Sequence, residues 1–166
     1  LRHHDIEPVF NEQTLAEGGP AFDSRRALTL LWEFATVLEA GRGKPSANPQ
    51  NVEYGFHVDW AEPEGRIDIV PRRRGSPLDK LVAELMIVAN ATWGKLLAEA
   101  QVAAIYRVQS NGKVRMTTAA LSHEGLGVDC YAWSSSPLRR YVDLLNQWQL
   151  LAHLAGEAPP FTARSE

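Results

Sequence analysis

The sequence contains a single cysteine, Cys130, among its 166 residues. One thiol excludes an internal disulfide framework and a cysteine-based zinc cluster, and it fits a reducing compartment. We interpret Cys130 as a small apolar core residue. No uncharged apolar run approaches the roughly 18 to 20 residues needed to span a bilayer, and no signal peptide is recognisable. We therefore expect a cytoplasmic protein with no membrane partner.

Positive charge and familiar catalytic motifs are also scarce. The formal net charge is −3, so a nucleic-acid site must be a local basic patch. The sequence has no P-loop, no G-x-S-x-G elbow and no H-E-x-x-H motif. Its aspartates are scattered, with no adjacent pair and no D-x-D spacing, although metal-dependent phosphodiester hydrolysis commonly uses clustered carboxylates. His3, His4 and Asp5 are conceivable metal ligands, but we interpret them as solvated.

The hydrophobic pattern predicts three long helices, because apolar residues recur at three- and four-residue steps. The predicted helices cover residues 24–40, 77–100 and 136–155. The first follows Asp23 and ends at Gly41, and the last ends at Gly156. Residues 1–22 show little periodicity and predict an irregular lead-in. Residues 41–50 are dense in turn formers and predict an exposed loop, in which Arg42 and Lys44 either contact RNA or are solvated.

Period-two alternation predicts two antiparallel hairpins. The first joins residues 52–60 to 66–70, and the second joins 103–108 to 113–117 through an Asn111-Gly112 turn. With 45% hydrophobic residues, the chain suits one compact unit with its own core. We predict the α+β class, with long helices packed on a mainly antiparallel sheet built from these hairpins.

Two of the helices are predicted to begin at a Ser-Pro pair, Ser76-Pro77 and Ser136-Pro137. Asp79 follows Ser76 by three residues and resembles the acid of a capping box. The last helix instead has Arg139 and Arg140 in its expected first turn, where a cation opposes the helix dipole by about 0.3 to 1 kcal/mol. Because serine hydroxyls, free N–H groups and guanidinium groups all suit an oxyanion, we predict a phosphate there.

These residues lie in segments that resemble a known family. The segment HEGLGVDCYAWSSSPLRRYVDLLNQWQL, residues 123–150, is similar to the closing motif of the RNB catalytic domain of the ribonuclease II and ribonuclease R family. LVAELMIVAN, residues 81–90, resembles a helix of that domain, and AAIYRVQ, residues 103–109, follows in the family's order. The resemblance covers roughly half of the chain, and the part before residue 51 matches only loosely.

The resemblance implies a domain organisation. Residues 1–166 would be the middle and C-terminal part of an RNB-type exoribonuclease domain, and the metal-binding N-terminal half and the flanking cold-shock and S1 domains would be missing from it. The start at Leu1, not at a methionine, also suggests a fragment or a processed piece. Only residues 110–122 connect the last two matched segments, where the family often has a longer helical insertion, so we expect a shortened variant.

The resemblance also implies an activity: 3′-to-5′ hydrolysis of single-stranded RNA to nucleoside 5′-monophosphates with Mg²⁺. By match to the family's motif, Arg139 is the catalytic arginine that clamps the phosphate being cleaved, with a plain ion pair to Asp143 as the alternative. We expect Asp143 to orient an arginine and not to bind a metal. The Mg²⁺ ligands would lie outside this chain, and we predict that the isolated chain is inactive.

Further RNA or phosphate contacts are expected at Arg140, Ser135, Ser136, Arg74, Glu84 and Phe56. Four of these residues have a structural alternative: helix capping for Ser136, a solvated basic run for Arg74, an ordinary surface position or an arginine-orienting role for Glu84, and core packing for Phe56. His123 is expected to form structural hydrogen bonds and not to act as a general acid or base.

Two other functions remain open. The first alternative is a non-catalytic RNA-binding or scaffolding module that derives from an RNB domain and keeps the phosphate clamp. The second is a helical protein-interaction domain with no RNA role. An upstream D-x-D or D-D motif in the same reading frame would favour the enzyme, and loss of RNA binding with rising salt would indicate phosphate contacts.

Overall fold

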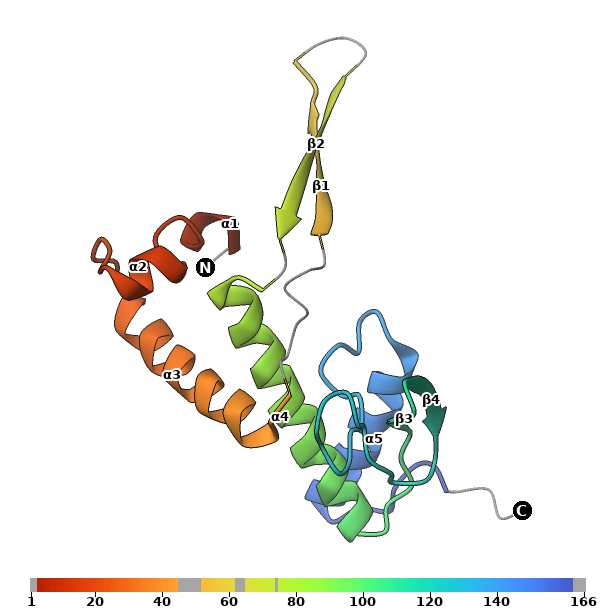
Figure 1. Ribbon diagram of the computed structural model, residues 1–166. Helices are drawn as coiled ribbons and strands as arrows, with labels where there is room; N and C mark the ends of the chain where they lie inside the picture. Colours follow the sequence, from red (N-terminus) through yellow and green to blue (C-terminus); the bar gives the residue numbers. More distant parts are fainter. Residues whose placement is uncertain (1–2, 45–51, 62–64, 74, 163–166) are drawn as a thin grey trace. The chain divides into compact units, whose positions relative to one another are not determined.

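The computed structural model describes residues 3–44, 52–61, 65–73 and 75–162 (Figure 1). The chain divides into two compact units, which replace the single unit expected: unit 1 comprises Leu1–Ala35 and Pro45–Ala83, and unit 2 comprises Thr36–Lys44 and Glu84–Glu166. The elements in chain order are α1 (His3–Ile6), α2 (Glu12–Ala16), α3 (Arg25–Arg42), β1 (Val52–Asp59), β2 (Arg66–Arg73), α4 (Pro77–Glu99), β3 (Tyr106–Ser110), β4 (Lys113–Thr117) and α5 (Tyr141–Ala155). The predicted α+β class is confirmed.

The core of unit 1 is formed by short N-terminal helices and parts of two long ones. Its buried residues are Ile6, Phe10, Ala35, Leu78 and Leu81. The predicted irregular lead-in is wrong, because α1 and α2 form there. A capping box in which the Asn11 side chain accepts from the Thr14 N–H, and Thr14 from the Asn11 N–H, starts α2. Helices of four and five residues are too short to show a helical period.

The first hairpin has one apolar and one charged face. Strands β1 and β2 pair antiparallel, with Phe56 opposite Ile69 and His57 opposite Asp68. Because successive side chains alternate between faces, Phe56 and Ile69 share the apolar face. Phe56 is 67% exposed and Ile69 60% exposed, so the core-packing alternative for Phe56 is wrong. The strand period alone cannot tell which face of a hairpin another element covers.

Helix α4 begins as predicted at Pro77. The Ser76 hydroxyl accepts from the Asp79 N–H at 3.3 Å, and the Asp79 carboxylate accepts from the Gly75 N–H. By length and mean hydropathy this helix could cross a membrane, but core helices pass the same test. Its buried Glu84 and Asn90 bind protein groups, which is typical of a core helix.

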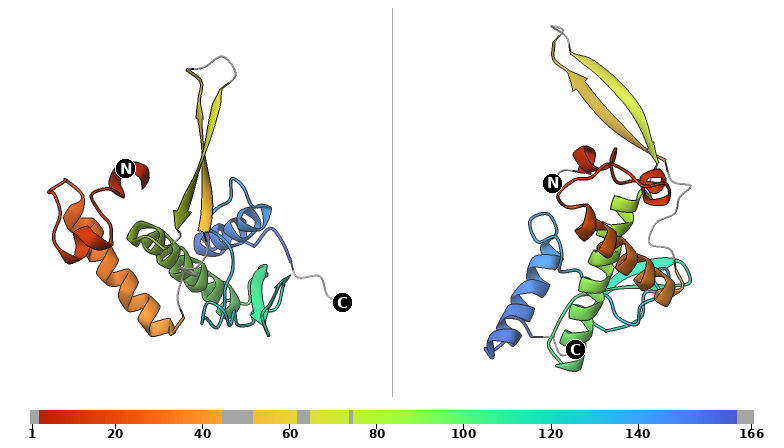
Figure 2. Two further views of the ribbon diagram at one scale, coloured as in Figure 1. Left: turned by 45° about the horizontal axis from the view of Figure 1, so that its top comes forward. Right: turned by 90° about the vertical axis from the view of Figure 1, so that its left-hand side faces the viewer.

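Unit 2 packs α4, α5 and the second hairpin around one core, and Figure 2 shows these elements side by side. Its buried residues are Leu97, Ala104, Tyr106, Val108, Ala132 and Leu150. Cys130 is half-buried against this core, and burial, with the nearby Asp129 charge, raises the pKa of its thiol to about 11. A protonated thiol with this pKa fits the structural role predicted for Cys130.

Two predicted boundaries in unit 2 differ from the structure. β3 begins at Tyr106, not at residue 103, because the Asn146 side chain binds both the N–H and the carbonyl of Ile105. α5 begins at Tyr141, and residues 137–139 form a turn before it. Of the strands described, β1 and β2 form one two-stranded sheet and β3 and β4 another, so the hairpins do not join in one sheet.

Candidate functional site

The loop that leads from Tyr131 into α5 is held by a buried asparagine of α4. Asn90 Oδ1 accepts from the Ser134 N–H at 2.9 Å and from the Ser134 hydroxyl at 3.0 Å. Asn90 Nδ2 donates to the Tyr131 and Ser135 hydroxyl groups, both at 3.2 Å. One fully buried amide therefore fixes three residues of this loop, because a buried polar group must find partners.

Helix α4 and the loop approach each other closely at Gly94. A Cβ atom at this position would lie 2.9 Å from the Ala132 backbone nitrogen, closer than real Cβ atoms come. Gly94 is therefore the residue that lets the helix backbone reach the loop. The Ala132 N–H donates to the Asn90 carbonyl group at 3.2 Å, which adds a backbone link at the same place.

Two amides of α5 hold the same loop from the other side. Asn146 Nδ2 donates to the Trp133 carbonyl at 2.8 Å, and Gln147 Nε2 donates to the Ser134 carbonyl at 2.6 Å. The sequence interpretation included Asn90, Asn146 and Gln147 in helices but assigned them no role. Their signal is a polar amide among apolar neighbours on a helix, a position that implies buried hydrogen bonds.

A buried ion pair closes the loop onto α5. Arg140 binds Asp143 with two hydrogen bonds, from Nε at 2.7 Å and from Nη2 at 2.6 Å. The Asp143 carboxylate, which is fully buried, also accepts from the Ser136 N–H at 2.8 Å. The arginine paired with Asp143 is thus Arg140, and the alternative pairing of Arg139 with Asp143 is wrong.

The same contacts explain why α5 does not begin at Ser136-Pro137. Arg140 is the N-cap residue, with extended backbone angles (φ −131°, ψ 114°) and no capping hydrogen bond from its side chain. The Ser136 N–H group donates to the Asp143 carboxylate. The Ser136 hydroxyl does not act as the N-cap of α5, because the helix begins five residues later. Ser136 instead accepts at its carbonyl from the Arg140 N–H at 3.1 Å, which closes a turn.

Arg139 lies in this turn and is exposed. In the part of the chain that the structure describes, no carboxylate or carbonyl group accepts a hydrogen bond from its guanidinium group. Ser135 of the same loop is also exposed, and its hydroxyl accepts from Asn90 and, at 3.4 Å, from Arg140 Nη2. The loop thus presents the free guanidinium group of Arg139 and, at the next residue in the sequence, the guanidinium group of Arg140 that Asp143 holds. A free guanidinium group suits an oxyanion.

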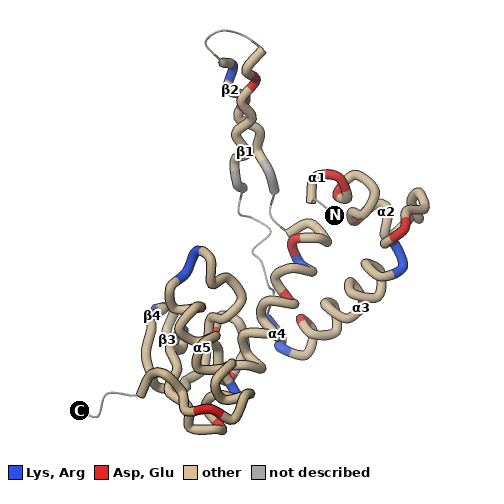
Figure 3. Tube along the Cα trace, turned by 180° about the vertical axis from the view of Figure 1, so that it is seen from behind, with Lys and Arg blue, Asp and Glu red and all other residues tan. Residues whose placement is uncertain are grey.

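Trp133 lies next to two guanidinium groups. The Cζ atom of Arg140 is 4.2 Å from the centre of the Trp133 ring, and that of Arg107, on β3, is 5.2 Å away. Arg107 Nη1 is 3.2 Å from His123 Nε2. Figure 3 marks the basic residues, including those of the loop that leads into α5. Cation–π contacts of this kind fix a guanidinium group without using its N–H donors.

His123 is 3% exposed and lies edge-on to Tyr131. Burial, and then the positive charge of Arg107, lower the pKa of its imidazole from the ordinary value. Since Arg107 can only donate, Nε2 accepts and Nδ1 carries the proton of the neutral ring. Among the described residues Nδ1 has no hydrogen-bond partner. The His123 backbone N–H donates to the Val128 carbonyl, so the residue also fixes the local chain.

The lowered pKa of His123 predicts that folding weakens in mild acid. Between the folded and unfolded pKa values the unfolded chain binds the proton and the folded chain does not, so the free energy of unfolding falls as pH drops below about 6.5. Urea unfolding between pH 5.5 and 8 measures the effect, which for one proton is at most about 1.4 kcal/mol per pH unit. His123→Gln should flatten the profile, and identical profiles for both proteins would contradict the assignment.

Glu84 is fully buried and pairs with an arginine of α3. Both carboxylate oxygens accept from Arg42, from Nε at 3.3 Å and from Nη2. Arg42 also donates to the Leu126 carbonyl, and a Cβ atom on Gly127 would lie 2.6 Å from the Arg42 carbonyl oxygen. The arginine-orienting alternative for Glu84 is therefore confirmed, because its carboxylate binds the Arg42 guanidinium group. The solvated loop position expected for Arg42 is wrong, because Arg42 ends α3 and is bound by Glu84.

The remaining predicted site residues lie elsewhere. Arg74 is outside the described residues, and Phe56 belongs to unit 1. Across the described ranges, no three His, Cys, Asp or Glu side chains form a group that could hold a metal ion. The described residues therefore do not fit a Mg²⁺ site.

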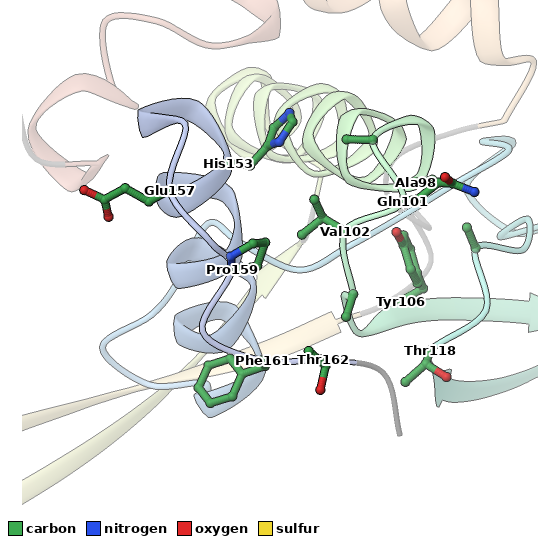
Figure 4. A pocket seen from close by; sticks show the side chains of 13 residues that line it. Ala98, Gln101, Val102, Tyr106, Thr118, His153, Glu157, Pro159, Phe161 and Thr162 are labelled. Atoms are coloured by element: carbon green, nitrogen blue, oxygen red, sulfur yellow. The ribbon is translucent and has the colours of Figure 1, made fainter. Parts of the chain in front are cut away.

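Unit 2 also contains a cavity of about 640 Å³ (Figure 4). It is lined by the end of α4, by Tyr106, and by His153, Glu157 and Phe161 around the C-terminal segment. Burial, and then the nearby Cys130, raise the pKa of Tyr106 to about 12, so its phenol stays neutral. None of the residues from 123 to 143 lines this cavity, so it adds nothing to the arginine site.

Comparison with known protein families points to one of them. The model of the RNB domain family matches residues 112–156. An uncharacterized ribonuclease of Synechocystis sp. is 29% identical over 109 residues, covering 50% of this chain and 16% of the relative. Exoribonuclease 2 of Vibrio cholerae is 46% identical over 39 residues, covering 24% of this chain and 6% of the relative. The chain thus spans only a small part of the curated relatives that it matches.

Solved structures with the same fold are also ribonucleases. The Dss1 exoribonuclease of Candida glabrata, an active-site mutant, aligns with a TM-score of 0.68 and 20% identity over 90% of this chain and 24% of that chain. RNase R of Mycoplasma genitalium in complex with double-stranded RNA aligns with a TM-score of 0.67 and 17% identity, over 92% of this chain and 36% of that chain. At these identities the likeness establishes the fold and not the function.

Proposed function

Because the chain belongs to the RNB family of ribonucleases, we propose that it supplies part of a 3′-to-5′ exoribonuclease that hydrolyses single-stranded RNA to nucleoside 5′-monophosphates. Its part is the middle and C-terminal portion of the domain, including the phosphate clamp and a wall of the RNA channel. The RNase R of Mycoplasma genitalium has been solved with double-stranded RNA and with ribose-methylated single-stranded RNA, and this supports an RNA ligand here.

One observation carries the proposal: Arg139 is an exposed arginine with no described acceptor, on a loop whose geometry is fixed from two helices. A guanidinium group in such a position neutralises a phosphate oxygen without first breaking an internal ion pair. Its neighbour Arg140 is bound to Asp143, so it acts as a fixed positive charge beside the clamp. Ser135 offers a hydroxyl group at the same surface.

The catalytic metal, Mg²⁺, would be held by carboxylates outside these 166 residues and would supply the activated water and the charge compensation for hydrolysis. This chain's own residues bind and orient the RNA backbone. We therefore propose that the isolated chain binds RNA but releases no nucleoside monophosphate in the presence of Mg²⁺. A cytoplasmic location remains part of the same proposal. Magnesium-dependent release of monophosphates by the purified chain would overturn the assignment of its role.

The test of the clamp is Arg139→Ala. We expect it to weaken binding of a 5′-fluorescein-labelled single-stranded oligoadenylate by roughly tenfold at low salt, because a charged two-point contact is lost. Fluorescence anisotropy without added metal measures the dissociation constant. Arg115→Ala removes an arginine on β4 that is also exposed, and it should leave the dissociation constant unchanged. Equal effects of both substitutions would contradict the clamp, and no binding by the unmodified chain would contradict the RNA-binding function.

The second candidate function, a non-catalytic RNA-binding or scaffolding module derived from an RNB domain, is favoured by the lack of a carboxylate cluster among the described residues. It shares the phosphate clamp with the enzyme, so RNA binding does not separate the two. Mixing the chain with the N-terminal half of an RNB domain, with Mg²⁺ and single-stranded RNA, does separate them. Restored release of monophosphates supports the enzyme, and binding without release supports the module.

A further inference from the structure

Arg107, on β3, is a half-buried arginine that no carboxylate of the described residues accompanies. In the described part of the chain its guanidinium group has two neighbours, the neutral His123 ring at 3.2 Å and the Trp133 ring at 5.2 Å. Neither carries a negative charge. The other two half-buried arginines near this loop differ, because Arg42 is bound by Glu84 and Arg140 by Asp143, each through two hydrogen bonds.

A half-buried positive charge without a counter-charge is unfavourable, because burial removes water that would otherwise stabilise it. His123 takes only one of the five N–H donors of the guanidinium group, through Nη1. The remaining donors have no described acceptor. Arg107 therefore has both the charge and the donors for an anion that the described residues do not supply.

Trp133 determines where that anion would lie. Its ring contacts Arg107 and also Arg140, the latter at 4.2 Å from Cζ to the ring centre. Arg140 precedes α5 directly and follows Arg139 in the exposed turn. One indole ring thus contacts a guanidinium group from β3 and the guanidinium group of Arg140, although β3 and the loop are distant in sequence.

We propose that Arg107 contacts a second phosphate group of bound single-stranded RNA, and that Trp133 is the positioning residue that holds it beside Arg140. The proposal rests on the proposed function, since it deepens the description of the same RNA site. Arg139 contacts one phosphate group, and Arg107 contacts a neighbouring one along the strand. His123, as a neutral acceptor, fixes the plane of the Arg107 guanidinium group.

The test compares two arginines of the same hairpin, Arg107 on β3 and Arg115 on β4. The 166-residue chain and its variants are titrated onto the labelled oligoadenylate at several potassium chloride concentrations. Arg107→Ala should weaken binding roughly fivefold at low salt and reduce the slope of log K against log salt by about 0.7, the value for one phosphate contact with a single strand. Arg115→Ala should leave both unchanged. Arg107→Lys should keep the slope and lose part of the affinity.

Trp133→Phe tests the positioning role. Phenylalanine keeps an apolar ring but forms a weaker cation–π contact, so binding should weaken roughly twofold while the salt slope stays the same. In the Arg107→Ala background the substitution should have a smaller effect, because one of the two guanidinium groups that it positions is gone. Equal effects in both backgrounds would overturn the positioning role of Trp133.

The outcomes separate this inference from the proposed function. If the unmodified chain binds no RNA, both are overturned. If it binds, and Arg139→Ala weakens binding while Arg107→Ala behaves like Arg115→Ala, only the second phosphate contact is overturned. Thermal denaturation checks that each variant folds. If Arg107→Ala does not fold, Arg107→Gln takes its place, and an unchanged salt slope in that variant overturns the proposal equally.

Discussion

Replacing Asp143 with alanine is expected to destabilise the folded chain by about 3 to 5 kcal/mol, the range for breaking a buried ion pair from one side. The fully buried carboxylate accepts two hydrogen bonds from Arg140 and one from the Ser136 N–H. Its removal leaves a guanidinium group with 20% of its side chain exposed and no counter-charge, and a backbone N–H group without a partner. The turn that contains Arg139 would lose its attachment to α5.

Urea denaturation followed by circular dichroism measures this loss of stability. The free energy of unfolding of Asp143→Asn should lie between those of the unmodified chain and the alanine variant. An amide oxygen can still accept from Ser136 but does not compensate the charge of Arg140. Asp129→Ala, at an exposed aspartate of the same unit, should change the free energy of unfolding by no more than about 0.5 kcal/mol. Equal losses at Asp129 and Asp143 would show that the ion pair does not stabilise the loop.

Glu84→Ala is the second large effect, and we expect a loss of about 3 to 5 kcal/mol for the same reason. The Arg42 side chain is only 12% exposed and would keep its charge without a counter-charge. The Leu126 carbonyl, its other partner, does not neutralise that charge. The contact joins the end of α3 to α4 and to the segment that contains Gly127, so its loss should loosen this part of unit 2.

A double substitution gives the matched control. Arg42→Met with Glu84→Leu replaces the buried pair with apolar groups of similar volume, and we expect stability within about 1 kcal/mol of the unmodified chain. Glu99→Ala removes a surface ion pair, to Lys95 at 3.7 Å, and should have an effect below about 1 kcal/mol. If the double variant is as unstable as Glu84→Ala, the lost packing and not the unpaired charge is responsible.

The sequence predicts a helix start at both Ser-Pro pairs, but in the structure only one of them begins a helix. Ser76-Pro77 is followed by Leu78 and Asp79, and a helix begins there as predicted. Ser136-Pro137 is followed by Leu138 and Arg139, and the helix begins later, at Tyr141. The missing acid three residues after the second serine was visible in the sequence. The sequence did not reveal that the Asp143 carboxylate binds the Ser136 N–H group, because this contact depends on the folded path of the turn.

The sequence also did not predict which polar side chains are buried and which apolar side chains are exposed. Glu84 and Asn90 are fully buried on α4, whereas the apolar Val82 on the same helix is 55% exposed. Phe56 alternates correctly along its strand and is nevertheless exposed. Periodicity gives the orientation of side chains around an element, but which side is covered depends on the neighbouring elements.

By itself the sequence determined the long helices, both hairpins, the α+β class and the resemblance to the RNB family, because these follow from local periodicity, turn chemistry and contiguous motifs. Only the tertiary structure decided which arginine is free and which is paired, and it brought Arg107 to the ring of Trp133. A charge is neutralised by whichever carboxylate lies next to it in space, and contacts between α3 and α4, or between β3 and the loop before α5, have no local sequence pattern to reveal them.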